Sequence, residues 1–202
     1  MNNSFNSTFS SISPSAKSLL LTKALTSIPF VKEVIEIMRH HNTLQISQEK
    51  EFTTSLILRL IHFETRYWSI DKALSEVDIK NILEIASGFS FRGLDLCRNP
   101  KIHYIDTDLP NLIEKKIILM EELIKKYCHY SPSNLTLLEL NALDEQAFME
   151  IVKKFPEGSI AIVDEGLLIY LNEEQKRKLC SIIYKILKIR DGYWITADIY
   201  VK

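Results

Sequence analysis

Small and acidic residues follow two apolar segments of the chain at a spacing that suits a nucleoside ligand. Gly88 closes the turn after the apolar run 79–86, and a glycine there lets the backbone approach a ligand closely because it has no Cβ. Asp106 and Asp108 stand at the end of the next run, 101–107, about 20 positions beyond the glycine. A carboxylate at that place can accept hydrogen bonds from both ribose hydroxyls. The pair of turns therefore indicates a nucleoside site.

A third apolar run, 159–164, also ends in an acid and a glycine, Glu165 and Gly166. In an open parallel sheet, ligands bind outside the carboxyl ends of the strands, where the strand order reverses. If the three runs are strands, their turns lie at one edge of the sheet. Glu84 is a further candidate, because a carboxylate inside an apolar strand is costly unless it is hydrogen-bonded. These residues predict one shared site.

The glycine turn does not have the pattern of a dinucleotide site. The segment 87–93 reads SGFSFRG, which is not GxGxxG, and it carries the bulky Phe89 and Phe91 after the first glycine. A pyrophosphate would need more bare backbone N–H groups and less bulk. A nicotinamide-dependent oxidoreductase is the alternative that this loop disfavours, whereas a nucleoside without phosphates fits it better.

The elements that would position these residues alternate between strands and helices after Asp78. Strands are expected over 79–86, 101–107, 135–140, 159–164 and 193–201, and helices over 110–127, over 144–154 and from the capping residue Asn172 to Asp191-Gly192. The run 159–164 is nearly continuous in apolar residues, like a buried parallel strand. This alternation predicts an α/β fold with a mostly parallel, Rossmann-like sheet and right-handed crossovers.

The part before this alternation is helical and divides the chain into regions. Apolar residues recur at spacings of three and four from about Ala16 to Phe63, and Pro29 separates the first two runs. We expect a flexible tail over 1–15, a helical lid region over 16–77, and a Rossmann-like, ligand-binding core over 78–202, in a single domain overall.

Composition excludes several classes of protein. The formal net charge of −1 gives no electrostatic reason to expect nucleic acid or an anionic membrane as partner. No apolar stretch is long enough to span a bilayer, and the N-terminus has no signal-peptide pattern, so a cytoplasmic protein is expected. Cys97, Cys128 and Cys180 form no CxxC pair, and no histidine spacing suits a metal. We expect reduced thiols and no metal site.

Four segments in order resemble the motifs of one enzyme family. They are 64–71 (ETRYWSID), 82–93 (ILEIASGFSFRG), 104–110 (YIDTDLP) and 164–171 (DEGLLIYL). Together they look like the motifs of the leucine carboxyl methyltransferases and their polyketide O-methyltransferase relatives. This resemblance implies a class I methyltransferase fold, S-adenosylmethionine as cofactor, and transfer of its methyl group to an oxygen, carboxylate or hydroxyl, of a small molecule or a peptide terminus.

The resemblance also implies roles for the first two motifs. Arg66 would grip the methionine carboxylate, for which its planar guanidinium is suited. Glu84, Ala86 and Gly88 would line the methionine and ribose portions of the cofactor.

The later motifs carry the remaining cofactor contacts. Asp108 would hold the ribose hydroxyls, with Asp106 as the fallback. Glu165 and Gly166 would lie near the methionine amino group and the sulfonium. After the third strand the chain departs from the family pattern, so that Asn141, or else Asp144, would contact the adenine.

The catalytic chemistry is less specified than the cofactor site. Tyr170 is a candidate residue of the acceptor pocket, and no general base stands out. The sequence ends at Lys202, after the fifth expected strand, where class I methyltransferase sheets normally continue. That end indicates either a fragment or a shortened protein. In a shortened protein we expect the flank of the last strand to be covered by a partner chain, such as a second copy in a homodimer, and the alternative function is a non-catalytic nucleoside-binding protein of the same fold.

Overall fold

The described part of the chain forms two compact units. The computed structural model describes residues 14–41, 53–128 and 130–198. One unit takes its residues from Met1–Thr65 and Glu114–Ser131, and the other consists of Arg66–Ile113 and Pro132–Lys202. Helices α4 (Thr54–Glu76) and α6 (Pro110–Tyr127) contribute residues to both. The sheet and all the predicted site residues belong to the second unit.

The first unit is helical, as its apolar periodicity predicts. It contains α2 (Pro14–Lys23), α3 (Val31–His40) and the adjoining parts of α4 and α6. Helix α3 buries one face, formed by Val31, Val34, Ile35, Ile37 and Met38. The segment predicted as a flexible tail lies outside the described residues except for its last two, which begin α2. The role of these helices as a lid stays a prediction.

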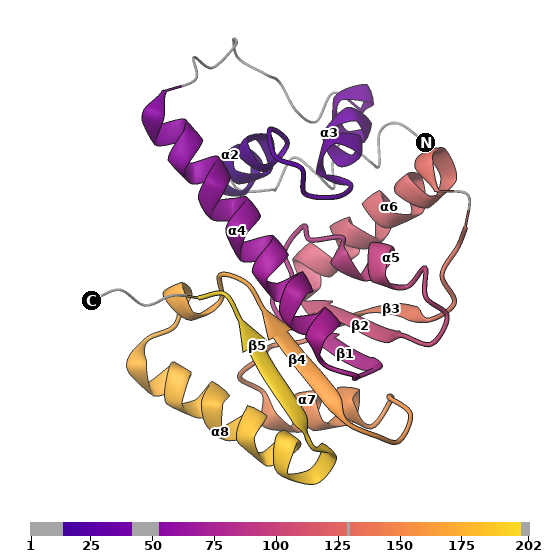
Figure 1. Ribbon diagram of the computed structural model, residues 1–202, viewed down its shortest axis with the longest axis vertical. Helices are drawn as coiled ribbons and strands as arrows, with labels where there is room; N and C mark the ends of the chain where they lie inside the picture. Colours follow the sequence, from indigo (N-terminus) through magenta and orange to yellow (C-terminus); the bar gives the residue numbers. More distant parts are fainter. Residues whose placement is uncertain (1–13, 42–52, 129, 199–202) are drawn as a thin grey trace. The chain divides into compact units, whose positions relative to one another are not determined.

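The second unit is built on five parallel strands (Figure 1). They are β1 (Asn81–Glu84), β2 (His103–Asp108), β3 (Leu135–Glu139), β4 (Ile160–Asp164) and β5 (Gly192–Thr196). Their spatial order is β3-β2-β1-β4-β5, so the direction of strand succession reverses between β1 and β4. The prediction of a Rossmann-like parallel sheet is confirmed.

Burial separates the central strands from the edges of the sheet. All residues of β1 and β4 are buried, whereas no residue of the outer strands β3 and β5 is. A central parallel strand is covered on both faces and therefore reads as a continuous apolar run. The expectation that 159–164 forms such a strand is confirmed.

Apolar side chains fill both faces of the sheet. One core contains Leu83 and Ile162 with residues of α7 (Glu145–Val152) and α8 (Glu173–Arg190). The opposite core contains Ile82 and Val163 with the C-terminal half of α4. Neighbouring residues of one strand point to opposite faces, which explains why adjacent apolar residues enter different cores.

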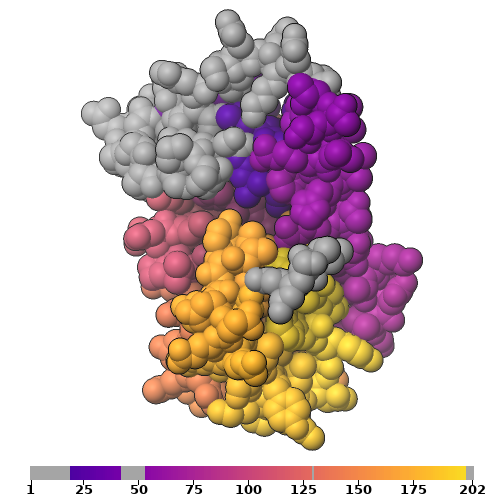
Figure 2. Space-filling model, turned by 90° about the vertical axis from the view of Figure 1, so that its left-hand side faces the viewer, coloured from indigo at the N-terminus to yellow at the C-terminus, as the bar shows by residue number. Residues whose placement is uncertain are grey.

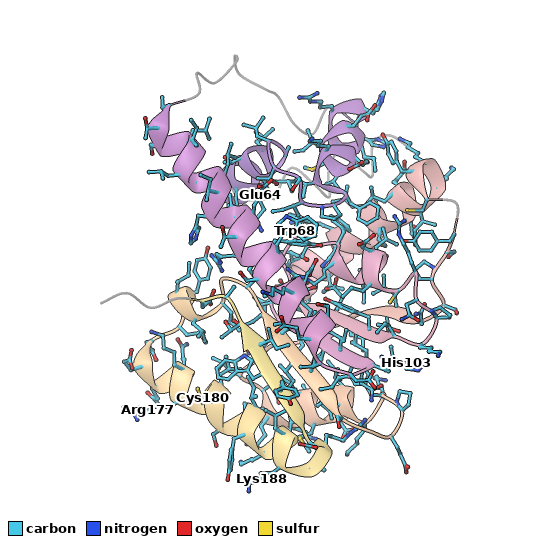
Figure 3. All side chains as sticks on the ribbon, in the orientation of Figure 1. Glu64, Trp68, His103, Arg177, Cys180 and Lys188 are labelled. Atoms are coloured by element: carbon cyan, nitrogen blue, oxygen red, sulfur yellow. The ribbon has the colours of Figure 1, made fainter. Side chains whose placement is uncertain are left out.

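Helix α8 begins and ends where its sequence indicates. The Asn172 side chain accepts a hydrogen bond from the Gln175 backbone, and the Gln175 side chain accepts one from the Asn172 backbone, which completes the predicted capping box. The helix ends at Arg190, before the predicted Asp191-Gly192 turn. Its outer face carries Arg177, Cys180 and Lys188 (Figure 3) and contributes to the orange and yellow surface in Figure 2.

Three features of the second unit differ from the sequence-based expectations. Strand β5 ends at Thr196, so that Ala197 and Asp198 lie beyond it rather than inside the predicted strand 193–201. Two short helices, α5 (Arg92–Leu96) and the 3-10 helix η1 (Leu168–Tyr170), were not predicted, because they are too short to show a periodic pattern.

Among the described helices, none has both the length and the apolar character to cross a membrane.

Candidate functional site

The turn after β1 contains two residues with positive φ, a backbone geometry that suits a ligand lying close to the main chain. Ala86 and Gly88 both have positive φ, 50° and 58°, and the Ser87 N–H donates to the Thr107 carbonyl at 3.0 Å. Only glycine adopts such a φ without steric cost, so Ala86 is held there by its surroundings. The turn is thus hydrogen-bonded to the end of β2, while the strand order reverses on the other side of β1, between β1 and β4.

Asp108 fixes the glycine of this turn. Its Oδ2 accepts a hydrogen bond from the Gly88 N–H at 2.7 Å, and its Oδ1 accepts one from the Leu109 N–H at 2.7 Å. Asp108 retains 8% exposure, whereas Asp106 has none and receives the Ser87 hydroxyl at 2.5 Å. Of the two predicted ribose ligands, Asp108 is therefore the one that keeps some exposure.

Glu84 lies in a buried ionic cluster around Arg92. The Arg92 guanidinium is completely buried and donates to Glu84 at 2.8 Å, to Asp71 at 2.6 Å and to Glu165 at 3.3 Å. The Tyr104 hydroxyl donates to the second oxygen of Glu84 at 2.7 Å. Both oxygens of Glu84 are thus occupied, and the residue is 1% exposed.

The cluster joins elements that are far apart in the sequence. Arg92 begins α5, Asp71 lies on α4, Glu84 ends β1 and Glu165 follows β4. The Tyr67 ring lies 4.2 Å from the guanidinium carbon of Arg92, within the range of a cation–π interaction. Since Glu84 and Glu165 share one cation, the cluster fixes the turns after β1 and β4 relative to each other.

A second ionic group lies at the ends of β4 and β5. Arg66 Nη2 donates to Asp198 Oδ1 at 2.7 Å, and the same carboxylate accepts the N–H groups of Gly166 at 2.6 Å and Leu168 at 2.7 Å. Gly166 has φ 87°, and a Cβ there would lie 3.1 Å from Arg66 Nη2. The positive φ favours glycine here, and a larger residue would also crowd the arginine.

One donor of the Arg66 side chain lacks a partner. Its Nε is buried and has no hydrogen-bond partner within the described residues. A guanidinium has five N–H donors, and a buried unsatisfied donor is costly. An anionic group bound beside Gly166 would satisfy that donor.

The remaining predicted residues are Asn141, Asp144 and Tyr170. Asn141 is exposed and uses its side chain to accept from the Leu143 N–H, while Asp144 caps α7. The structure thus gives both a local structural role, and the predicted adenine contact stays a prediction. Tyr170 belongs to η1 and is 78% exposed.

Two residues of the site were missed at the level of sequence. Arg92 lies inside the motif 82–93, whose resemblance implies roles for Glu84, Ala86 and Gly88 but none for Arg92. Asp198 was placed within the fifth strand. Its function depends on where β5 ends, which the apolar pattern 193–201 does not reveal.

Asp164, the last residue of β4, makes the folded state sensitive to pH. Burial raises the pKa of Asp164 from 3.8 to about 6, although Trp194 and Thr196 donate hydrogen bonds to its carboxylate at 2.6 Å and 2.9 Å. Between pH 4 and 6 the folded state keeps a proton that the unfolded state releases. The contribution of this group to stability therefore falls as pH rises through that window.

We expect Asp164→Asn to remove this dependence, because the amide does not ionise. From pH 4 to pH 7 the free energy of unfolding of the variant should gain about 2–3 kcal/mol relative to the unchanged protein, since one pKa unit corresponds to about 1.4 kcal/mol. Urea titrations at both pH values measure this difference. A difference between the two proteins that does not change with pH would contradict it.

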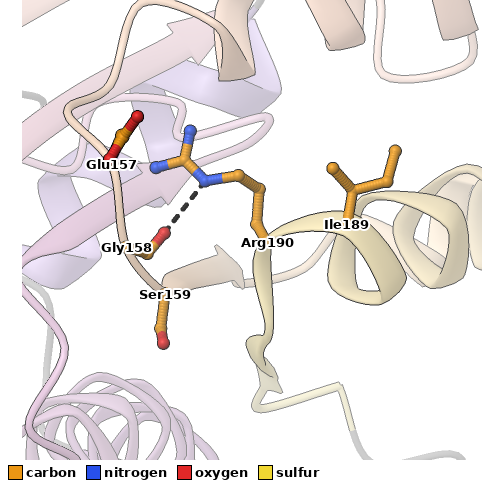
Figure 4. Close-up of a pocket in the computed structure, with 5 residues that line it drawn as sticks. All are labelled: Glu157, Gly158, Ser159, Ile189 and Arg190. Carbon is orange, nitrogen blue, oxygen red and sulfur yellow. Dashed lines mark hydrogen bonds between the residues drawn. The ribbon is translucent and has the colours of Figure 1, made fainter.

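A pocket of the second unit lies at the opposite end of the strands (Figure 4). It is lined by Glu157, Gly158, Ser159, Ile189 and Arg190, just before β4 begins and at the end of α8. Arg190 Nε donates to the Gly158 carbonyl at 2.9 Å there. This pocket is at the amino ends of the strands and is separate from the predicted site.

Comparison with known proteins bears on the fold. No protein-family model matches the sequence, and neither does any curated protein. Among solved structures, a DUF574 family protein from Streptomyces avermitilis aligns with 83% of this chain and 61% of its own, at a TM-score of 0.53 and 13% identity. This likeness supports the fold, a Rossmann-like parallel sheet with flanking helices.

Two further solved structures align with this chain at lower similarity. Magnesium protoporphyrin IX methyltransferase from Synechocystis, solved with bound S-adenosylhomocysteine, covers 84% of this chain and 67% of its own at 8% identity and a TM-score of 0.48. An O-methyltransferase family protein from Burkholderia thailandensis covers 65% of this chain and 37% of its own at 15% identity and a TM-score of 0.41. The chain thus spans little more than a third of that protein. The resemblance to the leucine carboxyl methyltransferases stays a prediction.

Proposed function

We propose that this chain binds S-adenosylmethionine at the carboxyl edge of its sheet and transfers the methyl group to an acceptor oxygen. One observation carries the proposal. A cationic donor and an anionic acceptor lie on the two sides of β1: Arg66 beside the turn after β4, and Asp108 bonded to the turn after β1. Those charges complement the carboxylate and the ribose hydroxyls at two ends of the cofactor.

The residues present fit this cofactor. The unpaired Nε of Arg66 would donate to the methionine carboxylate, and Asp108, which is still partly exposed, would accept from the ribose hydroxyls. The space beside the turn at Gly88 is open, since a Cβ there would meet nothing within 4 Å. Glu165 is held by Arg92, so its backbone rather than its carboxylate would face the ligand.

A nicotinamide dinucleotide fits less well. The second glycine of the loop, Gly93, lies in α5, where a Cβ would come within 2.7 Å of the Tyr104 ring. It therefore serves packing between α5 and β2 and does not expose backbone N–H groups to a pyrophosphate. Helix α5 has only five residues, which gives a weak dipole for binding phosphate.

When bound, the cofactor supplies an activated methyl group on a positively charged sulfur. The task of the protein is to hold an acceptor oxygen in line with that group, and much of the rate can come from this placement. A carboxylate acceptor needs no general base, whereas a hydroxyl would need one. The choice of an oxygen acceptor rests on the motif resemblance, and Tyr170 remains our candidate for the acceptor pocket.

Asp108→Ala should weaken binding of S-adenosylhomocysteine by about 10- to 100-fold, the value of one or two charge-assisted hydrogen bonds. Calorimetric titration of the purified chain measures it. Asp78→Ala is the matched control, because the Asp78 side chain is 92% exposed and precedes β1 at the other edge of the sheet. Asp108→Asn, which keeps an acceptor for the Gly88 N–H, separates loss of the turn from loss of the ligand contact.

Three outcomes would change the proposal. If the unchanged protein binds no S-adenosylhomocysteine at millimolar concentration, the cofactor assignment is wrong. If NADH binds instead, the oxidoreductase alternative replaces it. If S-adenosylhomocysteine binds but no transfer from labelled S-adenosylmethionine occurs to carboxylate or hydroxyl acceptors, the chain is a nucleoside-binding protein.

A further inference from the structure

We propose that Asp198 is a positioning residue, which holds the Arg66 guanidinium and the backbone of the turn after β4 in the geometry that binds the carboxylate of the cofactor. The inference rests on the proposed function and adds a residue that none of the four motifs contains. Its basis is the arrangement of one carboxylate with three donors from two elements.

Asp198 is placed to act through other residues rather than on the ligand. Its side chain is 1% exposed, and its two oxygens accept hydrogen bonds from Arg66 Nη2, the Gly166 N–H and the Leu168 N–H. Its own backbone N–H donates to the Thr196 hydroxyl at 3.2 Å, which ties it to the end of β5. With three donors on it, the carboxylate has little capacity left for a ligand.

Arg66 is the group through which Asp198 would act. The Arg66 side chain is 14% exposed, and the ion pair with Asp198 is the one ionic contact that holds it among the described residues. A long side chain with several rotatable bonds loses considerable entropy when it is fixed. If Asp198 fixes Arg66 before the ligand arrives, the ligand does not bear that cost on binding.

The same carboxylate shapes the turn at Gly166. Its hydrogen bonds to the Gly166 and Leu168 N–H groups hold the backbone at φ 87°, where a Cβ would lie only 3.1 Å from Arg66 Nη2. The positions of the Arg66 side chain and of the Gly166 turn therefore both depend on Asp198. Removal of the Asp198 carboxylate should increase the mobility of both.

The test compares two ligands that differ in the amino-acid portion, which contains the predicted contact. S-adenosylhomocysteine carries the amino-acid ammonium and carboxylate groups, and methylthioadenosine has the same adenine, ribose and thioether with a methyl group in place of that portion. For Asp198→Ala we expect S-adenosylhomocysteine to bind about tenfold weaker or worse, and methylthioadenosine to change less than about twofold. A merely structural role would weaken both ligands alike and would overturn the proposal.

A double-mutant cycle with Arg66→Ala completes the design. Because Asp198 acts in part through Arg66 and in part through the Gly166 turn, Asp198→Ala should cause a smaller loss of S-adenosylhomocysteine affinity in the Arg66→Ala background than in the unchanged protein. Equal losses in the two backgrounds would contradict an action through Arg66. Asp198→Asn keeps one acceptor oxygen and serves if the alanine variant does not fold; it should show the same ligand selectivity with a smaller loss.

The outcomes also separate this inference from the proposed function. If the unchanged protein binds S-adenosylhomocysteine and Asp198→Ala and Asp198→Asn bind it equally well, the positioning role is wrong while the cofactor assignment stands. If the unchanged protein binds neither ligand, the cofactor assignment is wrong and the positioning role is withdrawn with it.

Discussion

Arg92→Ala should lower the free energy of unfolding by about 3–5 kcal/mol, the range for removing one partner of a buried ion pair. The guanidinium is completely buried among the carboxylates of Asp71, Glu84 and Glu165. Its removal leaves these carboxylates without their cation and opens a cavity beside the Tyr67 ring. Urea unfolding followed by circular dichroism measures the loss.

The loss should depend on the fork shape of the guanidinium and on pH. Arg92→Lys keeps the charge but cannot reach all three carboxylates with one ammonium group, so we expect it to recover less than half of the loss. Burial raises the pKa of the Asp71 carboxyl even with Arg92 beside it. Without Arg92 that carboxyl should take up a proton more readily, and the variant should be less impaired at pH 5 than at pH 8.

Arg98→Ala is the matched control for this prediction. The Arg98 side chain is 61% exposed and pairs with Asp95 at 3.1 Å, and such exposed pairs contribute about 0–1 kcal/mol. Equal effects of the two substitutions would mean that the buried cluster does not stabilise the fold, and the assignment of Arg92 as the link between the turns after β1 and β4 would fall.

Gly192→Ala should destabilise the protein by about 3 kcal/mol or more, through backbone strain and direct overlap. Gly192 begins β5 at φ 130°, and a Cβ there would lie 1.9 Å from the carbonyl oxygen of Ile160, its partner in β4. The overlap is with backbone, which cannot rotate away. Strands β4 and β5 must therefore separate at this point.

Gly158→Ala isolates the contribution of the overlap. Gly158 has a similar φ, 117°, but a Cβ there would meet only the Asn81 side chain at an ordinary 3.8 Å. The free energy of unfolding of this variant should fall only through backbone strain, by about 1–3 kcal/mol. The same urea titration applies to both. Equal losses would show that β4 and β5 accommodate the extra methyl group without separating.

The predicted strands and helices were found from the sequence because their signals are local. The apolar run at β4, the capping box at Asn172 and the helix start at Pro110 each depend on neighbouring residues, and each is confirmed. The end of β5 was misplaced, since apolar residues continue past Thr196 and do not mark where pairing with β4 stops.

The candidate site was predicted in part for the same reason. Gly88 and Asp108 were recognised as a glycine turn and an acid at a suitable spacing, and the structure brings them together through a hydrogen bond. The sequence left open which of Asp106 and Asp108 faces a ligand. Asp106 is completely buried and accepts the Ser87 hydroxyl, whereas Asp108 keeps 8% exposure, and this difference depends on packing from elements distant in the chain.

The sequence alone determined the alternation of strands and helices and the residue types at the strand ends, because periodicity, capping and turn chemistry act over a few residues. Only the tertiary structure decided the partners of the charged groups. Arg92 reaches Glu165, 73 positions away, and Arg66 reaches Asp198, 132 positions away. Such pairs form because a parallel sheet brings the ends of its strands to one edge, and no local pattern in the chain records which side chains meet there.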